Sequence, residues 1–379
     1  MKMKPWIGVT GLVLLIPLGL AQCMLDEVAQ EPRSGGAPRF EVDPFWPNLP
    51  DNMILGQTSG IAVDHQDHVW VIHRPESVPD AEQAVLHNPE ATCCIPAPRV
   101  MEFDEVGNYV QGWGGPGEGY EWPLDEHTVY IDYKDNVWIS SAGGANTSAG
   151  TENHILKFTR SGQFLLQIGH RGQSKGSLDT ENLNNAADIY VSPETNEIFV
   201  ADGYVNRRII VFDADTGEFK RMWGAYGNEP DDSAPRTRVT EGDGPQQFNL
   251  VHGLGVSDDG FVYVADRLND RIQVFTIEGA FQREVFVARK TLGLGTVFGV
   301  GFSPDPEQRF MYVPDATNGH VRIFERQTLE QVGLVGRPGR QAGQFVTVHS
   351  VAVDSQGNLY TAEVTDGRRV QKFTFMGIL

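Results

Sequence analysis

The hydrophobic pattern of this chain repeats six times. Short stretches of alternating apolar residues open the repeats, at residues 59–64, 127–132, 187–192, 252–257, 298–303 and 349–354. A second apolar stretch follows each one after a turn rich in Asp, Asn or Gly, at residues 69–72, 137–139, 198–200, 262–264, 311–313 and 359–361. Period-two alternation between such turns predicts antiparallel hairpins. No helical period of comparable length competes with it, so we expect an all-β fold.

A second repeated phrase marks the third strand of the units. In its clearest copies Ala-Asp leads to Asn, Arg and Ile, and the copies cover residues 201–209, 265–272, 314–321 and 362–370. These phrases resemble NHL repeats, which build β-propeller blades. Neighbouring units start 46 to 68 residues apart (298−252 and 127−59), which is long for a bare four-stranded blade. We assign the surplus to two surface loops, residues 75–98 and 228–247, which are rich in Pro, Asp, Glu and Gly.

The two ends of the repeat region predict how the ring closes. The last unit has room for only three strands before Leu379, and residues 39–46 form a strand-like stretch ahead of the first unit. We predict that this stretch is the fourth strand of the last blade, because a closed ring hides the sheet edges. The expected fold class is therefore an all-β, six-bladed β-propeller of NHL-like repeats over residues 39–379, closed by an N-terminal strand.

The first residues have the layout of an export signal. Lys2 and Lys4 precede an apolar run at residues 6–20, and Ala21-Gln22-Cys23 follows it. Such a run is too short for a comfortable membrane span. We expect an export signal at residues 1–23 and a flexible linker at 24–38, which makes the mature chain periplasmic, secreted or lipid-anchored at the cell surface. In the lipid-anchored alternative, a lipoprotein signal attaches the lipid to Cys23, and the membrane is contacted only through it.

The amino-acid composition limits the classes of partner that we expect the chain to bind. The chain has 30 basic and 50 acidic residues, for a formal charge of −20. This balance argues against nucleic acid and anionic membrane surfaces as partners, since Lys and Arg clusters supply the affinity for both. Cys93 and Cys94 are adjacent in the first insertion, and we interpret them as structural, either as a vicinal disulfide or as two thiols.

The first position of the opening strands carries candidate chemistry. From the first unit to the last it reads Ser59, His127, Ala187, His252, Phe298 and His349. Equivalent positions in a closed ring lie on a circle, so alternate units would place three imidazoles around the axis. Three His ligands with an open fourth position suit Zn²⁺, because the open position can hold water or a substrate oxygen. We predict a metal site at these three histidines.

The loops after the second strands supply further candidates. Arg74 and Arg267 occupy one equivalent position in the first and fourth units, and Tyr204 lies one residue further along in the third. Paired guanidinium groups bind carboxylates well. The alternative is that these arginines form surface ion pairs with Asp202 or Asp266.

Together these residues resemble the catalytic core of the peptidyl-α-hydroxyglycine α-amidating lyase family. The similarity runs from about residue 56 to residue 373, and it is carried by residues 72–74, 127–129, 202–209, 250–254, 265–275 and 348–350. The resemblance implies a six-bladed propeller that cleaves the C–N bond of an α-hydroxyglycine-type amide and releases an amide and glyoxylate. The substrate would be a small molecule or peptide C-terminus with a carboxylate.

The resemblance also assigns roles to individual residues. It implies Zn²⁺ ligation by His127, His252 and His349. It implies that Tyr204 is the general base, and that Arg74 and Arg267 hold the substrate carboxylate.

Three departures from the family stand out. The family has an Asp that helps to bind a structural Ca²⁺ directly after the third His; here that residue is Ser350, which argues against Ca²⁺. The family has a disulfide partner beside its catalytic Tyr, and here that residue is Val205. The 75–98 insertion has no family counterpart and follows Arg74 directly, so it can reshape the pocket and change the substrate.

Two other functions stay open at this point. One is a metal-dependent hydrolase, such as a lactonase, in which Zn²⁺ activates water. The other is a non-enzymatic binding propeller, since fold alone does not fix function.

Overall fold

The computed structural model describes residues 36–88, 90–142 and 151–379. The chain divides into two units, residues 1–36 and 37–379, and the fold is that of the second. The export signal expected at residues 1–23 lies outside the described residues, as does the expected linker apart from residues 36–38.

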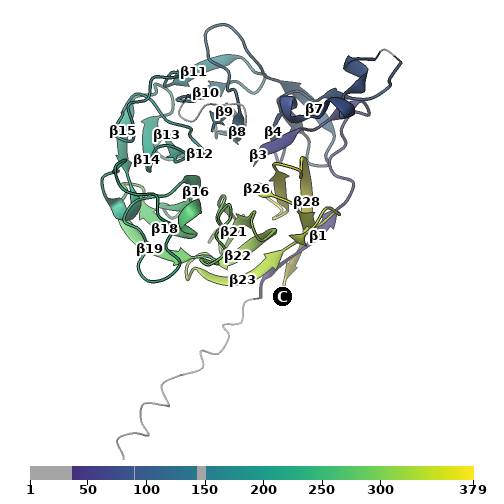
Figure 1. The fold of residues 1–379 in the computed structure, drawn as a ribbon. Helices are drawn as coiled ribbons and strands as arrows, with labels where there is room; N and C mark the ends of the chain where they lie inside the picture. The colour runs from purple at the N-terminus through teal and green to yellow at the C-terminus, as the bar shows by residue number, and fades with distance from the viewer. Residues whose placement is uncertain (1–35, 89, 143–150) are drawn as a thin grey trace, which may run out of the picture. The chain divides into compact units, whose positions relative to one another are not determined.

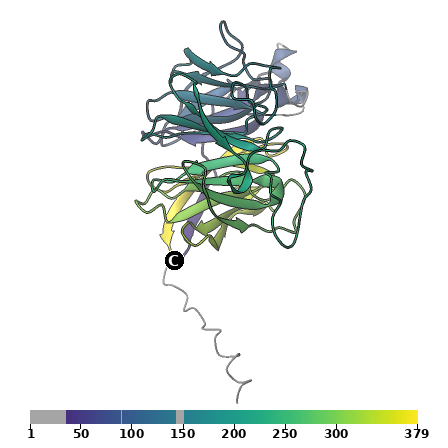
Figure 2. The ribbon, with the colours of Figure 1, turned by 90° about the vertical axis from the view of Figure 1, so that its left-hand side faces the viewer.

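Six four-stranded antiparallel sheets surround a central axis (Figure 1). From the axis outward, blade 1 consists of β3 (Gln57–Val63), β4 (Val69–Arg74), β6 (Val100–Phe103) and β7 (Tyr109–Trp113). Blade 2 consists of β8 (Glu126–Ile131), β9 (Val137–Ser141), β10 (Ile155–Phe158) and β11 (Phe164–Ile168). Blade 3 consists of β12 (Asp188–Val191), β13 (Glu197–Asp202), β14 (Arg208–Asp213) and β15 (Phe219–Trp223). Blade 4 is β16 (Val251–Val256), β17 (Phe261–Asp266), β18 (Arg271–Thr276) and β19 (Phe281–Phe286); blade 5 is β20 (Gly301–Phe302), β21 (Phe310–Asp315), β22 (His320–Glu325) and β23 (Glu330–Val335); blade 6 is β26 (Val348–Val353), β27 (Leu359–Glu363), β28 (Arg369–Ile378) and β1 (Pro38–Asp43). The predicted six-bladed propeller is confirmed. Figure 2 shows the ring from its side.

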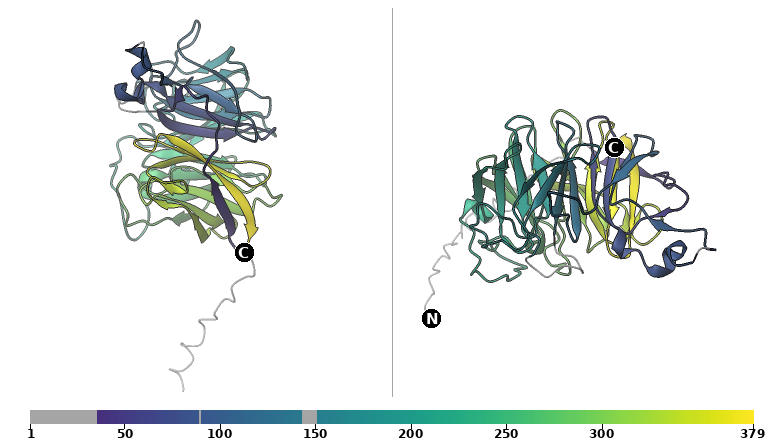
Figure 3. Two further views of the ribbon diagram at one scale, coloured as in Figure 1. Left: turned by 90° about the vertical axis from the view of Figure 1, so that its right-hand side faces the viewer. Right: turned by 90° about the horizontal axis from the view of Figure 1, so that it is seen from above.

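The ring closes as predicted. β1 is the outer strand of blade 6 and pairs antiparallel with β28, with Phe40 opposite Phe375 and Val42 opposite Phe373. The left panel of Figure 3 shows these two strands side by side, one from each end of the described residues. The pairing converts the two ends of the repeat region into one complete sheet.

Short elements lie outside the blades. They are β2 (Met53–Ile54) paired with β5 (Ile95–Pro96), β24 (Arg337–Pro338) paired with β25 (Gln344–Phe345), and the 3₁₀ turns η1 (Pro75–Ser77), η2 (Asp80–Glu82), η3 (Ala84–Leu86), η4 (Ala225–Gly227) and η5 (Arg267–Asn269). Among the described residues, no helix has the length and apolar character needed to cross a membrane.

The hairpin turns after the inner strands of blades 1 and 2 share one hydrogen-bond arrangement. In blade 1 the Trp70 indole N–H donates to Asp64 at 3.0 Å, and in blade 2 Trp138 donates to Asp132 at 2.9 Å. Each Asp also accepts backbone N–H groups of its own turn, for example from His68. The repeated Asp of the sequence therefore fixes both the turn and a fully buried aromatic ring between blades.

The inner strand of blade 5 is shorter than its pattern predicts. Only Gly301 and Phe302 form β20, although the pattern covers residues 298–303. The opposite strand contains Pro314, whose carbonyl accepts the Phe298 N–H at 3.0 Å. Proline has no N–H to return, so the ladder is interrupted there.

Candidate metal centre

The three predicted histidines meet at the axis. His127, His252 and His349 stand at the start of the inner strands β8, β16 and β26, and all three are buried. Their ring centroids are 4.9, 4.7 and 4.7 Å apart, which is close to an equilateral triangle. One ring nitrogen of each lies within 4.8 Å of the other two, so the three form a group able to hold one metal ion.

Backbone carbonyls fix the orientation of these rings. Nδ1–H of His127 donates to the Ala187 carbonyl at 2.7 Å, that of His252 to Phe298 at 2.5 Å and that of His349 to Ser59 at 2.7 Å. The three acceptors are the residues at the same first position in blades 3, 5 and 1. Each acceptor therefore belongs to the blade after its histidine. With Nδ1 protonated, Nε2 carries the free lone pair, as metal ligation requires.

The electrostatic surroundings keep the three rings neutral. Burial, followed by His349 and Arg74, holds the pKa of His127 well below its usual range. Burial and then Arg267 lower the pKa of His252 in the same way, and burial with Arg74 lowers the pKa of His349 to about 3. Neutral imidazole is the form that binds metal, so protons compete weakly for this site at neutral pH.

Tyr204 reaches the triad from the loop between β13 and β14. Its Oη lies 3.0 Å from Nε2 of His127 and 3.1 Å from Nε2 of His252. The preceding residue must be small, because a Cβ at Gly203 would come within 2.1 Å of the Val251 carbonyl oxygen. Close packing of this loop against blade 4 thus brings the phenol to Nε2 of two histidines of the candidate metal site.

Arg267 lies beside the same phenol. Its Nη1 is 3.3 Å from Tyr204 Oη, its Nε–H donates to the Leu294 carbonyl at 2.6 Å, and it lies over the Phe298 ring at 4.1 Å. The side chain is 9% exposed. The alternative of surface ion pairing is wrong here, because Asp266 pairs with a different arginine.

That arginine is part of the repeated phrase. Asp266 binds Arg271 at 2.9 Å and accepts the Asn249 N–H at 2.7 Å; in blade 3, Asp202 binds Arg208 at 2.9 Å. Both ion pairs are fully buried. Because they connect the end of the second strand to the loop that enters the blade, they hold the loops that carry Tyr204 and Arg267.

Arg74 is held differently. Its Nε–H donates to the Glu126 carbonyl at 2.9 Å, its Nη1 donates to Gln57 Oε1 at 3.2 Å, and the Asp125 carboxylate is 3.5 Å away. Its charge still reaches the triad, since it lowers the pKa of His127 and His349. Gln57 and Asp125 carry no signal in the sequence, because each touches Arg74 only through the fold.

His73 is a positioning residue that sequence reasoning missed. Its Nδ1 accepts the Gly56 N–H at 3.0 Å, and its Nε2–H donates to the Ala97 and Pro98 carbonyls, each at 3.0 Å. The ring therefore joins the start of β3 to the returning end of the insertion, directly beside Arg74. In the sequence, the one feature that could have pointed to His73 is its position next to Arg74.

The insertion at residues 75–98 projects outward from blade 1 (Figure 1). It contains η1 to η3 and β5, and a disulfide joins Cys93 to Cys94. Ser77 at its start accepts the Gln57 N–H at 2.7 Å and donates to the Arg74 carbonyl at 2.6 Å. The insertion therefore acts on the site through the backbone of Arg74.

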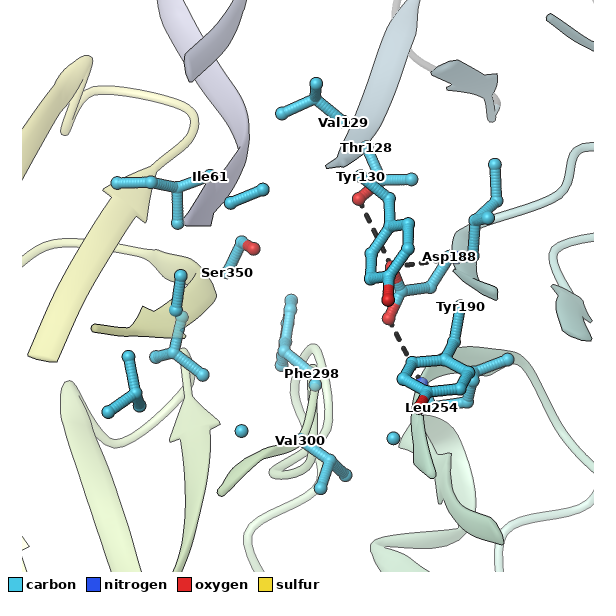
Figure 4. A pocket seen from close by; sticks show the side chains of 18 of the residues that line it. Ile61, Thr128, Val129, Tyr130, Asp188, Tyr190, Leu254, Phe298, Val300 and Ser350 are labelled. Atoms are coloured by element: carbon cyan, nitrogen blue, oxygen red, sulfur yellow. Dashed lines mark hydrogen bonds between the residues drawn. The ribbon is translucent and has the colours of Figure 1, made fainter. Parts of the chain in front are cut away.

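A cavity of about 330 Å³ runs along the inner strands (Figure 4). Its lining includes His127, His252 and His349, so it reaches the triad. We call it the inner channel. Besides the three histidines, residues in or next to all six inner strands line it, among them Tyr130, Asp188, Tyr190, Asp258, Val300 and Ser350. Tyr204, Arg74 and Arg267 are not in its lining, because they approach the triad from the loops at the other end of the inner strands.

The family's Ca²⁺ ligand has no match in this channel. Ser350 presents a hydroxyl where the family has a carboxylate (Figure 4). The carboxylate near Ser350 in the channel lining is Asp188, which accepts hydrogen bonds from the Thr128 hydroxyl at 3.2 Å, the Ile189 N–H at 3.0 Å and the Leu254 N–H at 3.1 Å. Both carboxylate oxygens already accept these hydrogen bonds, so the residues do not fit a calcium ion.

A second acidic group lies at the hairpin turns of blade 1. Asp64, His68 and Glu102 have ligand atoms within 4.8 Å of one another. Arg160 lies 2.8 Å from Asp64 and also contacts Glu102. A guanidinium thus already neutralises these carboxylates.

Comparison with known proteins finds similarity to amidating enzymes. It is 29% identical over 301 residues to peptidyl-glycine alpha-amidating monooxygenase A of Xenopus laevis, covering 74% of this chain and 29% of that one. It is 26% identical over 331 residues to a probable peptidyl-alpha-hydroxyglycine alpha-amidating lyase of Caenorhabditis elegans, covering 83% of this chain and 81% of that one. The chain is similar to proteins named as amidating lyases. This confirms the resemblance seen in its sequence motifs, while the chain spans about a third of the length of the monooxygenases that it matches.

Further similarities concern the NHL and lactonase propellers. The chain is 26% identical over 351 residues to human NHL repeat-containing protein 3, covering 88% of this chain and 84% of that one. The family model described as a lactonase with a 7-bladed β-propeller matches residues 236–349. A solved streptogramin B lyase structure matches with a TM-score of 0.51 at 11% identity, over 89% of this chain and 98% of that one, which supports the propeller fold alone.

Proposed function

We propose that this chain is an exported, Zn²⁺-dependent lyase that cleaves the C–N bond of an α-hydroxyglycine-type amide to an amide and glyoxylate. One observation carries the proposal. Tyr204 Oη lies within 3.1 Å of two metal-ligand nitrogens and 3.3 Å from a guanidinium of Arg267. A candidate metal site, a candidate proton acceptor and a candidate anion-binding group therefore lie in contact with one another.

The donor set fits zinc. Three neutral imidazoles present Nε2 to one centre, and three protein ligands with an open fourth position are typical of catalytic Zn²⁺. When bound, the ion would act as a Lewis acid toward the substrate hydroxyl and lower its proton affinity. The relatives named as amidating lyases support the same assignment.

The side chains account for the remaining steps. Arg267 and Arg74 would hold the substrate carboxylate, which orients the α-carbon toward Tyr204. Tyr204 would act as the general base that accepts the hydroxyl proton. The oxygen electrons then form the aldehyde C=O, the C–N bond breaks, and its electron pair stays on nitrogen. The proton returns from Tyr204 to that nitrogen, so the products are a neutral amide and glyoxylate, and no water is consumed.

Glyoxylate release from α-hydroxyhippurate tests this function. Metal-loaded wild-type protein should release glyoxylate, and Tyr204→Phe should reduce the rate by about 10²- to 10⁴-fold, the usual contribution of a general base. Tyr133→Phe is the matched control, because this phenol is exposed and bonds to Asn196 in a hairpin turn. Absence of glyoxylate from metal-loaded wild-type protein would reject the proposal for this substrate.

A lactonase-like hydrolase is the second candidate. The lactonase model covers His252, His349 and Arg267, whereas Tyr204 lies outside residues 236–349. If Zn²⁺ activates water, lactone hydrolysis should survive Tyr204→Phe. Equal loss of both activities in this variant would count against the hydrolase.

A binding propeller without catalysis is supported by the likeness to NHL repeat-containing protein 3. Metal analysis separates it from the enzymes. Substoichiometric Zn²⁺ that is unchanged in His252→Ala would favour the binding propeller.

Export and the type of partner are part of the proposal. The expected location is the periplasm, the medium or a lipid-anchored position at the cell surface, and the expected partner is a carboxylate-bearing molecule. Cell fractionation of wild-type and Cys23→Ser chains tests the location, since lipid anchoring requires Cys23.

A further inference from the structure

The triad borders two regions of opposite charge. On the side of the loops between the second and third strands, which we call the loop face, the charged side chains that lower the pKa of the three histidines are Arg74 and Arg267. A divalent cation approaching from this side meets two guanidinium groups. An anionic substrate is attracted by the same groups.

The charged side chains around the inner channel are negative, opposite to those of the loop face. Burial, then Tyr190 and the carboxylates Asp132 and Asp188, raise the pKa of Tyr130 well above its usual range. Burial, followed by Asp258 and Glu194, raises the pKa of Tyr190 to about 12. Among the described residues that line the channel there is no Lys or Arg.

Two channel carboxylates stand at different depths. Asp258 is exposed in the hairpin turn after β16, where the channel lining ends. Asp188 lies one residue past the ring of first positions, between Thr128 and Leu254 (Figure 4). Burial raises the pKa of Asp188 to about 6, so its carboxylate is mainly ionised at neutral pH. The cavity of about 330 Å³ is many times the share of liquid volume of one water molecule, roughly 30 Å³.

We infer that metal ions enter and leave the triad through the inner channel, led by Asp258 and Asp188, whereas the anionic substrate approaches from the loop face. This division rests on the proposed metal site. It separates the path of the cation from the path of the anion, so that the arginines that bind substrate do not obstruct metal loading. It also assigns Asp188 a role beyond its hydrogen bonds between blades.

Co²⁺ uptake by apo-protein, followed by visible absorbance, is the test. Val353 lines the channel near the hairpin-turn end and is only partly buried, so Val353→Phe should narrow the path. We expect it to slow Co²⁺ association and chelator-driven release by the same factor, about tenfold or more, and to leave the dissociation constant unchanged. Val332→Phe on the outer strand β23 is the matched control, because Val332 is also a partly buried residue of the same apolar cluster.

Charge at the channel end is tested separately. Asp258→Lys should slow Co²⁺ association about fivefold at low salt and about twofold at physiological salt, because screening weakens the attraction. Glu105→Lys makes the same charge change in an exposed turn at the outer side of blade 1 and should leave the rate unchanged. This pair decides the question even if Val353→Phe fails to fold.

The outcomes separate the route from the site. If wild-type protein takes up no Co²⁺, or if His252→Ala still binds one equivalent, the metal site itself is wrong and the route falls with it. If Co²⁺ binds through the triad but Val353→Phe and Asp258→Lys behave like their controls, the inferred route is wrong and the proposed function stands.

Discussion

Protonation of His73 gives a quantitative test of how the insertion and Arg74 are held. The ring needs a free lone pair at Nδ1, which accepts the Gly56 N–H, and a proton at Nε2, which is donated to the Ala97 and Pro98 carbonyls. A second proton removes the acceptor and places a buried charge next to Arg74. Burial is the main cause that lowers the pKa of His73 from 6.5 to about 4.

The size of the expected loss of stability follows from the linkage between protonation of His73 and folding. A folded-state pKa below the unfolded value means that the stabilisation is complete above about pH 6.5 and is lost as the pH falls toward about 4. The full loss in the free energy of unfolding from this residue is about 3 kcal/mol, of which about 2 kcal/mol is lost by about pH 5.

Urea unfolding of metal-free protein at about pH 7.5 and about pH 5 measures this loss. Between these two pH values, the free energy of unfolding of wild-type protein should fall by about 2 kcal/mol more than that of His73→Gln, because glutamine at position 73 does not titrate. His87→Gln is the control, because His87 is exposed, and it should follow wild type. Equal losses in wild type and His73→Gln would refute the reasoning.

Three further outcomes test the supports of the site. Asp202→Ala leaves buried Arg208 unpaired and should lower the free energy of unfolding by about 3–5 kcal/mol, measured by urea unfolding. Gly203→Ala should displace Tyr204 and reduce glyoxylate release about tenfold or more while metal content is retained; an unchanged rate would contradict the packing argument. Arg267→Lys should lower kcat about 100-fold, whereas Arg74→Lys should mainly raise KM, because only Arg267 contacts Tyr204; steady-state kinetics that show equal effects would contradict this asymmetry.

The repeat pattern was sufficient to predict the architecture. Alternation and turn residues are local signals, so six opening strands, their partners and the closing strand at residues 39–46 could be placed without a structure. The prediction was less accurate in blade 5, where a proline across the ladder shortened β20. That effect depends on which residue lies opposite, and register between strands is not visible in one strand's own pattern.

The candidate site was predictable only in part. Equivalent positions on a ring brought His127, His252 and His349 together, as the repeat alignment indicated. Their Nδ1 acceptors are backbone carbonyls 46 to 290 residues away, and a carbonyl leaves no mark on residue identity. The hydrogen bonds of His73 could not be predicted for the same reason, because its partners are also backbone groups. The channel carboxylate of Asp188 escaped notice because its neighbours Thr128 and Leu254 belong to other blades.

X-ray absorption of the zinc-loaded protein, together with metal analysis, tests the central claim most directly. The account predicts one Zn²⁺ per chain with three imidazole nitrogens at about 2.0–2.1 Å, and loss of that ion in His127→Ala, His252→Ala and His349→Ala alike. Fewer than three imidazole ligands, or stoichiometric zinc that persists in these variants, would contradict it.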